Sequence, residues 1–147
     1  MMRINGFVLC DDIRNEVGNK KSLMGVYTKE IVFPTTSDDK NPWPRHMNLA
    51  IMLDFAITGD TKRRAEKFVV SYVFNGNEKK LGEGTFTLSQ EECERDDEFQ
   101  VIIFSSNAKY SFDAAGTLTH LVSLHDGSGN VLEQTCTPVS FTIRLQD

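Results

Sequence analysis

The chain is 147 residues long and carries 16 basic and 21 acidic side chains, which gives a net charge of −5. A chain of this length forms one domain with its own hydrophobic core and needs neither disulfides nor a metal for stability. The acidic balance argues against a nucleic-acid partner, because phosphate binding requires clustered Lys and Arg side chains. The nearest such cluster, residues 62–64, is followed by Glu66.

The three cysteines, Cys10, Cys93 and Cys136, are widely spaced and form no CxxC pair. Their odd number predicts reduced thiols. Residues 1–7 contain polar side chains where a signal peptide needs an unbroken apolar segment. No stretch of the sequence approaches the roughly 20 apolar residues of a membrane helix. We therefore predict a soluble cytoplasmic protein without a membrane partner.

The first strand is expected at Gly6–Asp11, and a long second strand at Ser22–Phe33. The Gly18-Asn19 turn between them predicts a β-hairpin. Residues 35–46 contain two prolines around Trp43, and proline has no N–H for a strand ladder. We expect a long loop there.

The clearest strand signal follows, because every second residue from Met47 to Ile57 is apolar. A period of two places these side chains on one face of a strand, and that face is expected to be buried. They are Met47, Leu49, Ile51, Leu53, Phe55 and Ile57.

Two further strands, Phe68–Phe74 and Lys80–Leu88, flank the hairpin signal Asn75-Gly76. Residues 61–67 are charged and fit either a short helical turn or a plain connection. The polar run that begins at Ser89 predicts one helical turn, because Glu92 follows Ser89 at the spacing of a capping box.

The last part of the chain again reads as strands. Phe99–Phe104 is predicted as a strand that ends in a turn at residues 105–107. Thr117–His125 and Val131–Leu145 are expected to form a hairpin, with a break in the final strand at Pro138.

About eight strands without a long amphipathic helix predict an all-β fold. We expect a single antiparallel β-sandwich over residues 1–147, because strands that alternate in this way have one solvated face and one core face.

Residues 9–27, LCDDIRNEVGNKKSLMGVY, contain a Cys-Asp-Asp-Ile-Arg start, a Glu-Val-Gly turn and a Ser-Leu-x-Gly-Val-Tyr strand. These elements resemble the opening of a functionally uncharacterised family of small β-sandwich proteins from bacteria and phages. The final strand, around residues 141–143, is also similar. The resemblance covers about the first third of the chain. It implies an immunoglobulin- or C2-like sandwich without enzymatic activity, and it supplies no site residues.

Motifs of catalysis are absent from the sequence. There is no Gly-x-Ser-x-Gly elbow and no glycine-rich loop ahead of a helix. His120 and His125 are five residues apart, which places them on opposite faces of one strand and makes a shared metal ion unfavourable. His120 falls in the apolar register and is expected to be a core or edge histidine with one satisfied nitrogen. We predict no enzyme, no cofactor and no metal.

Three aspartate pairs leave one alternative open. Asp11-Asp12 ends the first strand, and Asp38-Asp39 and Asp96-Asp97 lie in loops. Such pairs hold calcium where they converge at one end of a sandwich, and otherwise they are ordinary solvated turns.

The long loop offers the candidate partner-binding residues Trp43, Arg45 and His46. Trp and Arg are enriched in binding hot spots, and the flanking prolines lower the cost of ordering the loop. The alternative is that Trp43 folds back and covers the open end of the sandwich.

The function that we expect is a non-catalytic protein-interaction module of bacterial or phage origin, such as a phage-encoded inhibitor or decoy of a host protein. One alternative is a structural or decorating component of a larger assembly, including a homo-oligomer, in which a strand edge accepts a further strand. The other is a C2-like calcium- and membrane-binding module.

Overall fold

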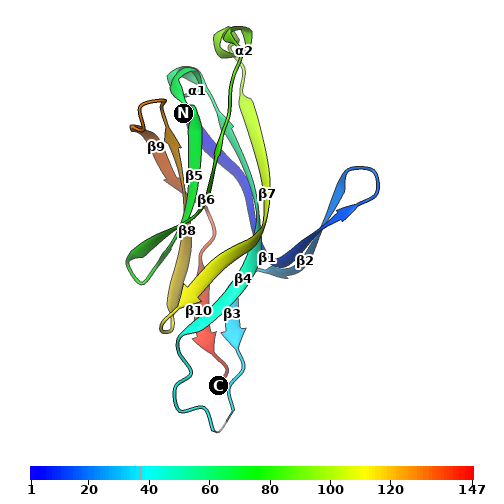
Figure 1. The fold of residues 1–147 in the computed structure, drawn as a ribbon, viewed down its shortest axis with the longest axis vertical. Coiled ribbons are helices and arrows are strands. Elements are labelled where there is room, and N and C mark those ends of the chain that lie inside the picture. Colours follow the sequence, from blue (N-terminus) through cyan, green and yellow to red (C-terminus); the bar gives the residue numbers. More distant parts are fainter. Residues whose placement is uncertain (37) are drawn as a thin grey trace.

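The computed structural model describes residues 1–36 and 38–147, which form ten strands and two short helices (Figure 1). Sheet A has the strand order β2-β1-β4-β7. Its strands are β1 (Met2–Glu16), β2 (Lys20–Tyr27), β4 (Arg45–Ile57) and β7 (Phe99–Phe112).

Sheet B has the order β3-β10-β8-β5-β6, and β9 also pairs with β8. Its strands are β3 (Glu30–Phe33), β5 (Lys67–Phe74), β6 (Asn77–Thr85), β8 (Gly116–His125), β9 (Val131–Cys136) and β10 (Phe141–Leu145). The all-β sandwich prediction is confirmed, with more strands than the eight expected. One pair, β3 with β10, is parallel.

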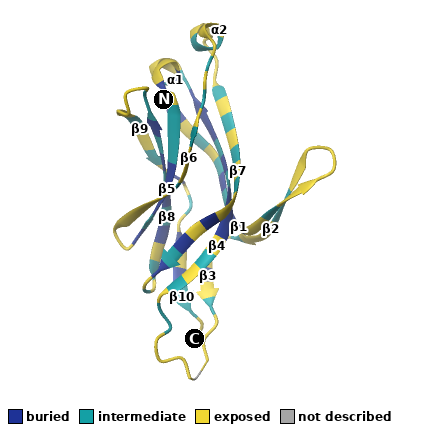
Figure 2. Ribbon diagram, in the orientation of Figure 1, coloured by how far each residue is buried: buried dark blue, intermediate teal, exposed yellow. Residues whose placement is uncertain are grey.

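The core lies between the two sheets and contains the predicted alternating face of β4 (Figure 2). Five of its six residues are buried, and only Met47 is half-buried. Aromatic pairs join the sheets: the ring centroids of Tyr72 and Tyr110 are 4.8 Å apart, and those of Phe74 and Phe112 are 5.0 Å apart. Complete burial of one such side chain stabilises the fold by about 1.5–3 kcal/mol.

The expected long strand at residues 22–33 is wrong, because the chain changes sheets within it. β2 pairs with β1 in sheet A, whereas β3 pairs with β10 in sheet B. Only Thr28 and Lys29 separate the two strands. The expected final strand is likewise two strands, and both lie along the same side of β8. β10 pairs with residues 116–118 and β9 with residues 121–125.

The predicted turn at residues 105–107 is also wrong. β7 continues through these residues, and its pairing with β4 shifts between Leu49 and Ile51. The extra β7 residues form a bulge, in which Asn107 has a φ of 62°. A bulge bends a strand without ending it, so polar residues at this place do not mark a turn.

The predicted hairpin turns are confirmed. Gly18 and Asn19 join β1 to β2 with φ values of 83° and 59°, and Asn75 and Gly76 join β5 to β6 with φ values of 49° and 82°. The second turn is a two-residue hairpin, because Phe74 pairs with Asn77, and positive φ at both of its central residues matches the twist of the strands. The first turn has three residues, because Glu16 pairs with Lys20 and Val17 also lies between the strands.

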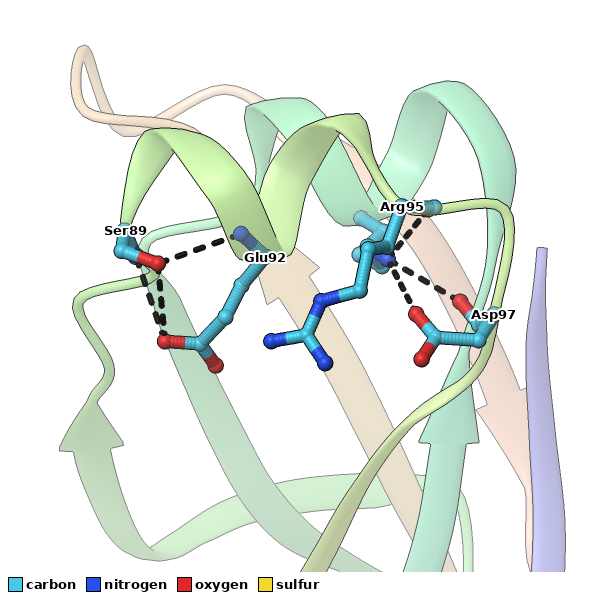
Figure 3. A network of polar contacts seen from close by, with 5 residues as sticks. Ser89, Glu92, Arg95 and Asp97 are labelled. Atoms are coloured by element: carbon cyan, nitrogen blue, oxygen red, sulfur yellow. Dashed lines mark hydrogen bonds and ion pairs between the residues drawn. The ribbon is translucent and has the colours of Figure 1, made fainter.

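Both helices, α1 (Gly59–Arg64) and α2 (Gln90–Glu94), lie at one end of the sandwich. The predicted capping box is present in α2: the Ser89 hydroxyl accepts from the Glu92 amide, and the Glu92 carboxylate accepts from the Ser89 amide (Figure 3). The buried Lys62 of α1 donates from Nζ to the carbonyl oxygens of Arg95 and Asp97, at 2.8 and 3.0 Å. This contact fixes α1 against the segment between α2 and β7.

Candidate protein-binding surface

The outer face of sheet A, which points away from the core, carries apolar side chains on all four strands. In one row across the sheet, Val8 of β1 pairs with Met52 of β4, and Met52 pairs with Phe104 of β7. Side chains of directly paired residues lie on the same face. The neighbouring rows add Ile102 on β7 and Val26 on β2, and Met24 lies two residues before Val26 on β2.

We call this set the outer patch. It consists of Val8, Met24, Val26, Met52, Ile102 and Phe104. Its edges are strongly exposed, with exposed fractions of 52% for Ile102, 41% for Phe104, 49% for Val26 and 40% for Met24. Apolar residues gathered on one face of a small protein are typical of a surface that binds another protein.

A polar rim borders the outer patch toward the helices. Asp54 lies opposite Ile102 in the sheet, and its carboxylate accepts from the side-chain amides of Gln100, at 3.0 Å, and Asn5, at 3.4 Å. Beyond it, Arg3 and Glu98 form an ion pair of 2.7 Å. An apolar centre with a hydrogen-bonded rim is the usual composition of a protein interface.

The strand β7 also ends sheet A, so one of its edges has no neighbouring strand among the residues that the structure describes. Residues 99–106, FQVIIFSS, contain no charged side chain. Natural edge strands usually carry charges, prolines or bulges that prevent further pairing. Here the bulge comes only at residues 106–107. After it, the amide of Ser111 donates to the Tyr72 hydroxyl at 3.3 Å, so this amide already has a partner.

A hairpin arm, residues 11–26, projects from the sandwich (Figure 1) and carries two residues of the outer patch, Met24 and Val26. It begins where β1 leaves β4, after the pair of Cys10 with Ala50. From the arm, Lys21 Nζ lies 5.6 Å from the centroid of the Phe104 ring, a cation–π distance. The arm therefore supplies part of the outer patch and a cation at its border.

The base of the arm is held by a polar contact. The Tyr27 hydroxyl donates to Asp11 Oδ1 at 2.5 Å. Partial burial, together with this carboxylate, raises the pKa of Tyr27 to about 12. Gly25 has a φ of +67°, and a Cβ there would lie 2.2 Å from Asp11 Oδ2, so only glycine allows this contact.

The three residues predicted to bind a partner lie in two environments. Trp43 is half-buried and its ring is nearly perpendicular to that of Phe33, with ring centroids 6.1 Å apart. Arg45 lies over the same Phe33 ring and forms an ion pair with Asp39 at 3.1 Å. His46 is exposed and lines a hollow between the sheet edges. The contacts of Trp43 are those of the alternative in which it folds back onto the sandwich, while the binding role of the three residues stays a prediction.

The prediction that His120 is a core histidine with one satisfied nitrogen is confirmed. His120 is completely buried, and its Nε2 lies 2.7 Å from the Tyr110 hydroxyl, while Nδ1 has no hydrogen-bond partner among the described residues. Burial lowers the pKa of His120 to about 3 and raises that of Tyr110. His125 instead contacts Ser123 Oγ at 3.0 Å.

The cysteine and aspartate side chains of the described residues form no candidate site. All three cysteines are free, and burial raises the pKa of the Cys10 thiol. The members of two aspartate pairs have separate partners, Tyr27 for Asp11 and Lys62 for Asp97. Within residues 1–36 and 38–147, no three His, Cys, Asp or Glu side chains gather as metal ligands.

The sequence prediction missed Ile102 and Phe104. It predicted Phe99–Phe104 as a strand and assigned no role to the face that carries Ile102 and Phe104. The signal was present, because residues 101–104 are apolar without interruption, whereas a strand with a solvated face alternates.

No helix in the described part of the chain has the length and apolar character needed to cross a membrane. Neither a protein-family model nor a curated protein sequence matches the chain.

Proposed function

We propose that this protein is a non-catalytic protein-interaction module that binds a partner protein through the outer patch. The observation that carries the proposal is the exposed apolar face that runs from β2 to β7 and ends at an uncharged free edge. Burial of this face against a partner removes apolar surface from water, which favours binding by about 25 cal/mol per Å² before the costs of association.

The finer proposal is an inhibitor or decoy of a host protein, of bacterial or phage origin and acting in the cytoplasm. The resemblance of residues 9–27 supports the origin, and the three free cysteines support a reducing compartment. The small size and the net charge of −5 fit a protein that remains in solution until it meets its target.

The free edge of β7 favours a second candidate, a structural component of a larger assembly. An extended segment of a neighbouring protein, or β7 of a second copy, can pair with residues 99–105 and continue sheet A. Ile102 and Phe104 would then contact the side chains of the added strand.

The test is a pull-down from native host lysate with the wild type and three variants. Phe104→Glu places a charge in the outer patch, and Trp43→Ala tests the loop. Val131→Glu is the matched control, because Val131 is 57% exposed but lies on β9 in sheet B. We expect one stoichiometric partner that is lost with Phe104→Glu and retained with Val131→Glu.

Two other outcomes of the pull-down would contradict the outer patch as the binding surface. Loss with Trp43→Ala alone would place the binding surface at the loop and contradict the outer patch. Equal loss with Phe104→Glu and Val131→Glu would mean non-specific adhesion. Sedimentation velocity of the isolated protein tests one form of the second candidate, because a protein that pairs through β7 with a second copy of itself self-associates, and an inhibitor of a host protein does not.

A further inference from the structure

We propose that a second site, the edge pocket, binds a small organic anion. The edge pocket is a hollow of about 390 Å³ at the open side of the sandwich, lined by residues of β4, β5, β6 and β7. Its recognition residues are His46 of β4, Lys79 of β6 and Lys109 of β7. This inference concerns a different surface and does not depend on the outer patch.

The charge around the edge pocket is unlike that of the rest of the protein. The chain has a net charge of −5, yet no Asp or Glu lines this hollow. Neither Lys79 nor Lys109 forms an ion pair within 4.0 Å among the described residues. Nearby in sheet B, by contrast, Lys67 and Lys80 both pair with Glu83, at 2.8 and 3.2 Å.

The floor of the edge pocket is aromatic. Tyr72 and Tyr110 are each 2% exposed, and their rings stack with an interplanar angle of 29°. The Tyr72 hydroxyl accepts a hydrogen bond from the Ser111 amide, and among the described residues this is its one hydrogen bond. Its own proton is therefore free to be donated to a ligand oxygen.

An acidic side chain close to the edge pocket is Asp113, just beyond the end of β7. It lines an adjoining hollow of about 80 Å³, which Lys79 and Ser111 also line. Its negative charge opposes an anion in the edge pocket. Removal of this charge is therefore expected to strengthen binding.

Size and chemistry together define the ligand class. Small-molecule sites occupy roughly 300–1,000 Å³, so the edge pocket suits a molecule of about one ring. The two lysines act as point charges for a carboxylate or phosphate group. The ring of the ligand would contact the apolar part of the lining, which is the half-buried Met47 and the margins of the two tyrosine rings.

Phenyl phosphate is a suitable probe, titrated into ¹⁵N-labelled protein and followed by NMR. We expect saturable shifts of amides near His46, Lys109 and Ser111. Loss of one charge-assisted contact weakens binding by about tenfold, so Lys79→Gln and Lys109→Gln should each raise the Kd by that factor. Asp113→Asn should lower the Kd. Lys29→Gln is the control, because Lys29 is exposed and does not line the hollow.

The proposal is overturned if the shifts do not saturate, if phenol produces the same shifts, or if Lys29→Gln weakens binding as much as Lys109→Gln. Equal affinity for inorganic phosphate and phenyl phosphate would refute the role of the tyrosine floor, and with it the assignment of an organic ligand.

Discussion

The buried His120 makes the stability of this protein depend on pH, and one substitution isolates the effect. The imidazole is completely buried next to Tyr110, Phe7 and Phe141. Its Nδ1 has no partner in the described part of the chain, so a proton on both nitrogens would place a charge in an apolar environment. The pKa of His120 is therefore lowered from 6.5 to about 3.

The direction of the effect follows from proton binding. Above pH 6.5 the imidazole is neutral in the folded and the unfolded chain, and His120 contributes no pH dependence. As the pH falls below 6.5, the unfolded chain binds a proton that the folded protein does not bind until the pH is near 3. Stability is therefore lost between these values, by about 1.4 kcal/mol per pH unit at most. Between pH 7 and pH 5 the loss amounts to about 2 kcal/mol, or about 4–8 °C in Tm.

The control is His120→Gln, whose amide can still bond the Tyr110 hydroxyl but does not titrate. We expect urea unfolding to show a less stable variant at pH 7, with a weaker dependence on pH between 7 and 5 than the wild type. The difference between the two slopes isolates His120 from the other titrating groups. Identical slopes, or an NMR titration of His120 in the folded protein near pH 6.5, would refute the reasoning.

Three further predictions concern packing and capping. Trp43→Ala should lower the free energy of unfolding by about 2 kcal/mol, because it removes the contact with Phe33; an unchanged urea midpoint would instead favour a role in binding. Lys62→Met should cost about 2–3 kcal/mol in thermal unfolding, because the carbonyls of Arg95 and Asp97 lose their donor. The exposed neighbour Arg63 is the control, and an equal effect of Arg63→Met would contradict this account. Ser89→Ala should cost about 1 kcal/mol through loss of the α2 cap, and the same cost from Gln90→Ala would contradict the capping role.

Side-chain alternation predicted the faces of the strands but not their partners. The apolar period of Met47–Ile57 correctly predicted the buried face of β4, because burial is a property of the side chains themselves. The same kind of signal at residues 22–33 could not show that β2 and β3 join different sheets. Hydrogen-bond partners depend on segments elsewhere in the chain, and β3 pairs with β10 near the C-terminus.

The candidate site was predicted less well than the fold, for a related reason. Trp43 was predicted as a binding residue from its residue type alone. In the fold its ring packs against Phe33, and the sequence does not show that these two residues meet. The outer patch is assembled from four strands, and its rows appear only once the registers of β1, β2, β4 and β7 are known. The edge pocket likewise joins His46, Lys79 and Lys109 from distant segments.

The parallel pair of β3 and β10 has a consequence for synthesis of the protein on the ribosome. Glu30 and Arg144, which form an ion pair across this pair of strands, are 114 residues apart. A four-residue strand has no stability of its own, so β3 stays unpaired until β10 is synthesised. The hairpin of β1 and β2 emerges from the ribosome long before that. The pairing of β3 with β10 therefore forms only after the end of the chain has been synthesised. Until then the growing chain exposes apolar segments that chaperones recognise.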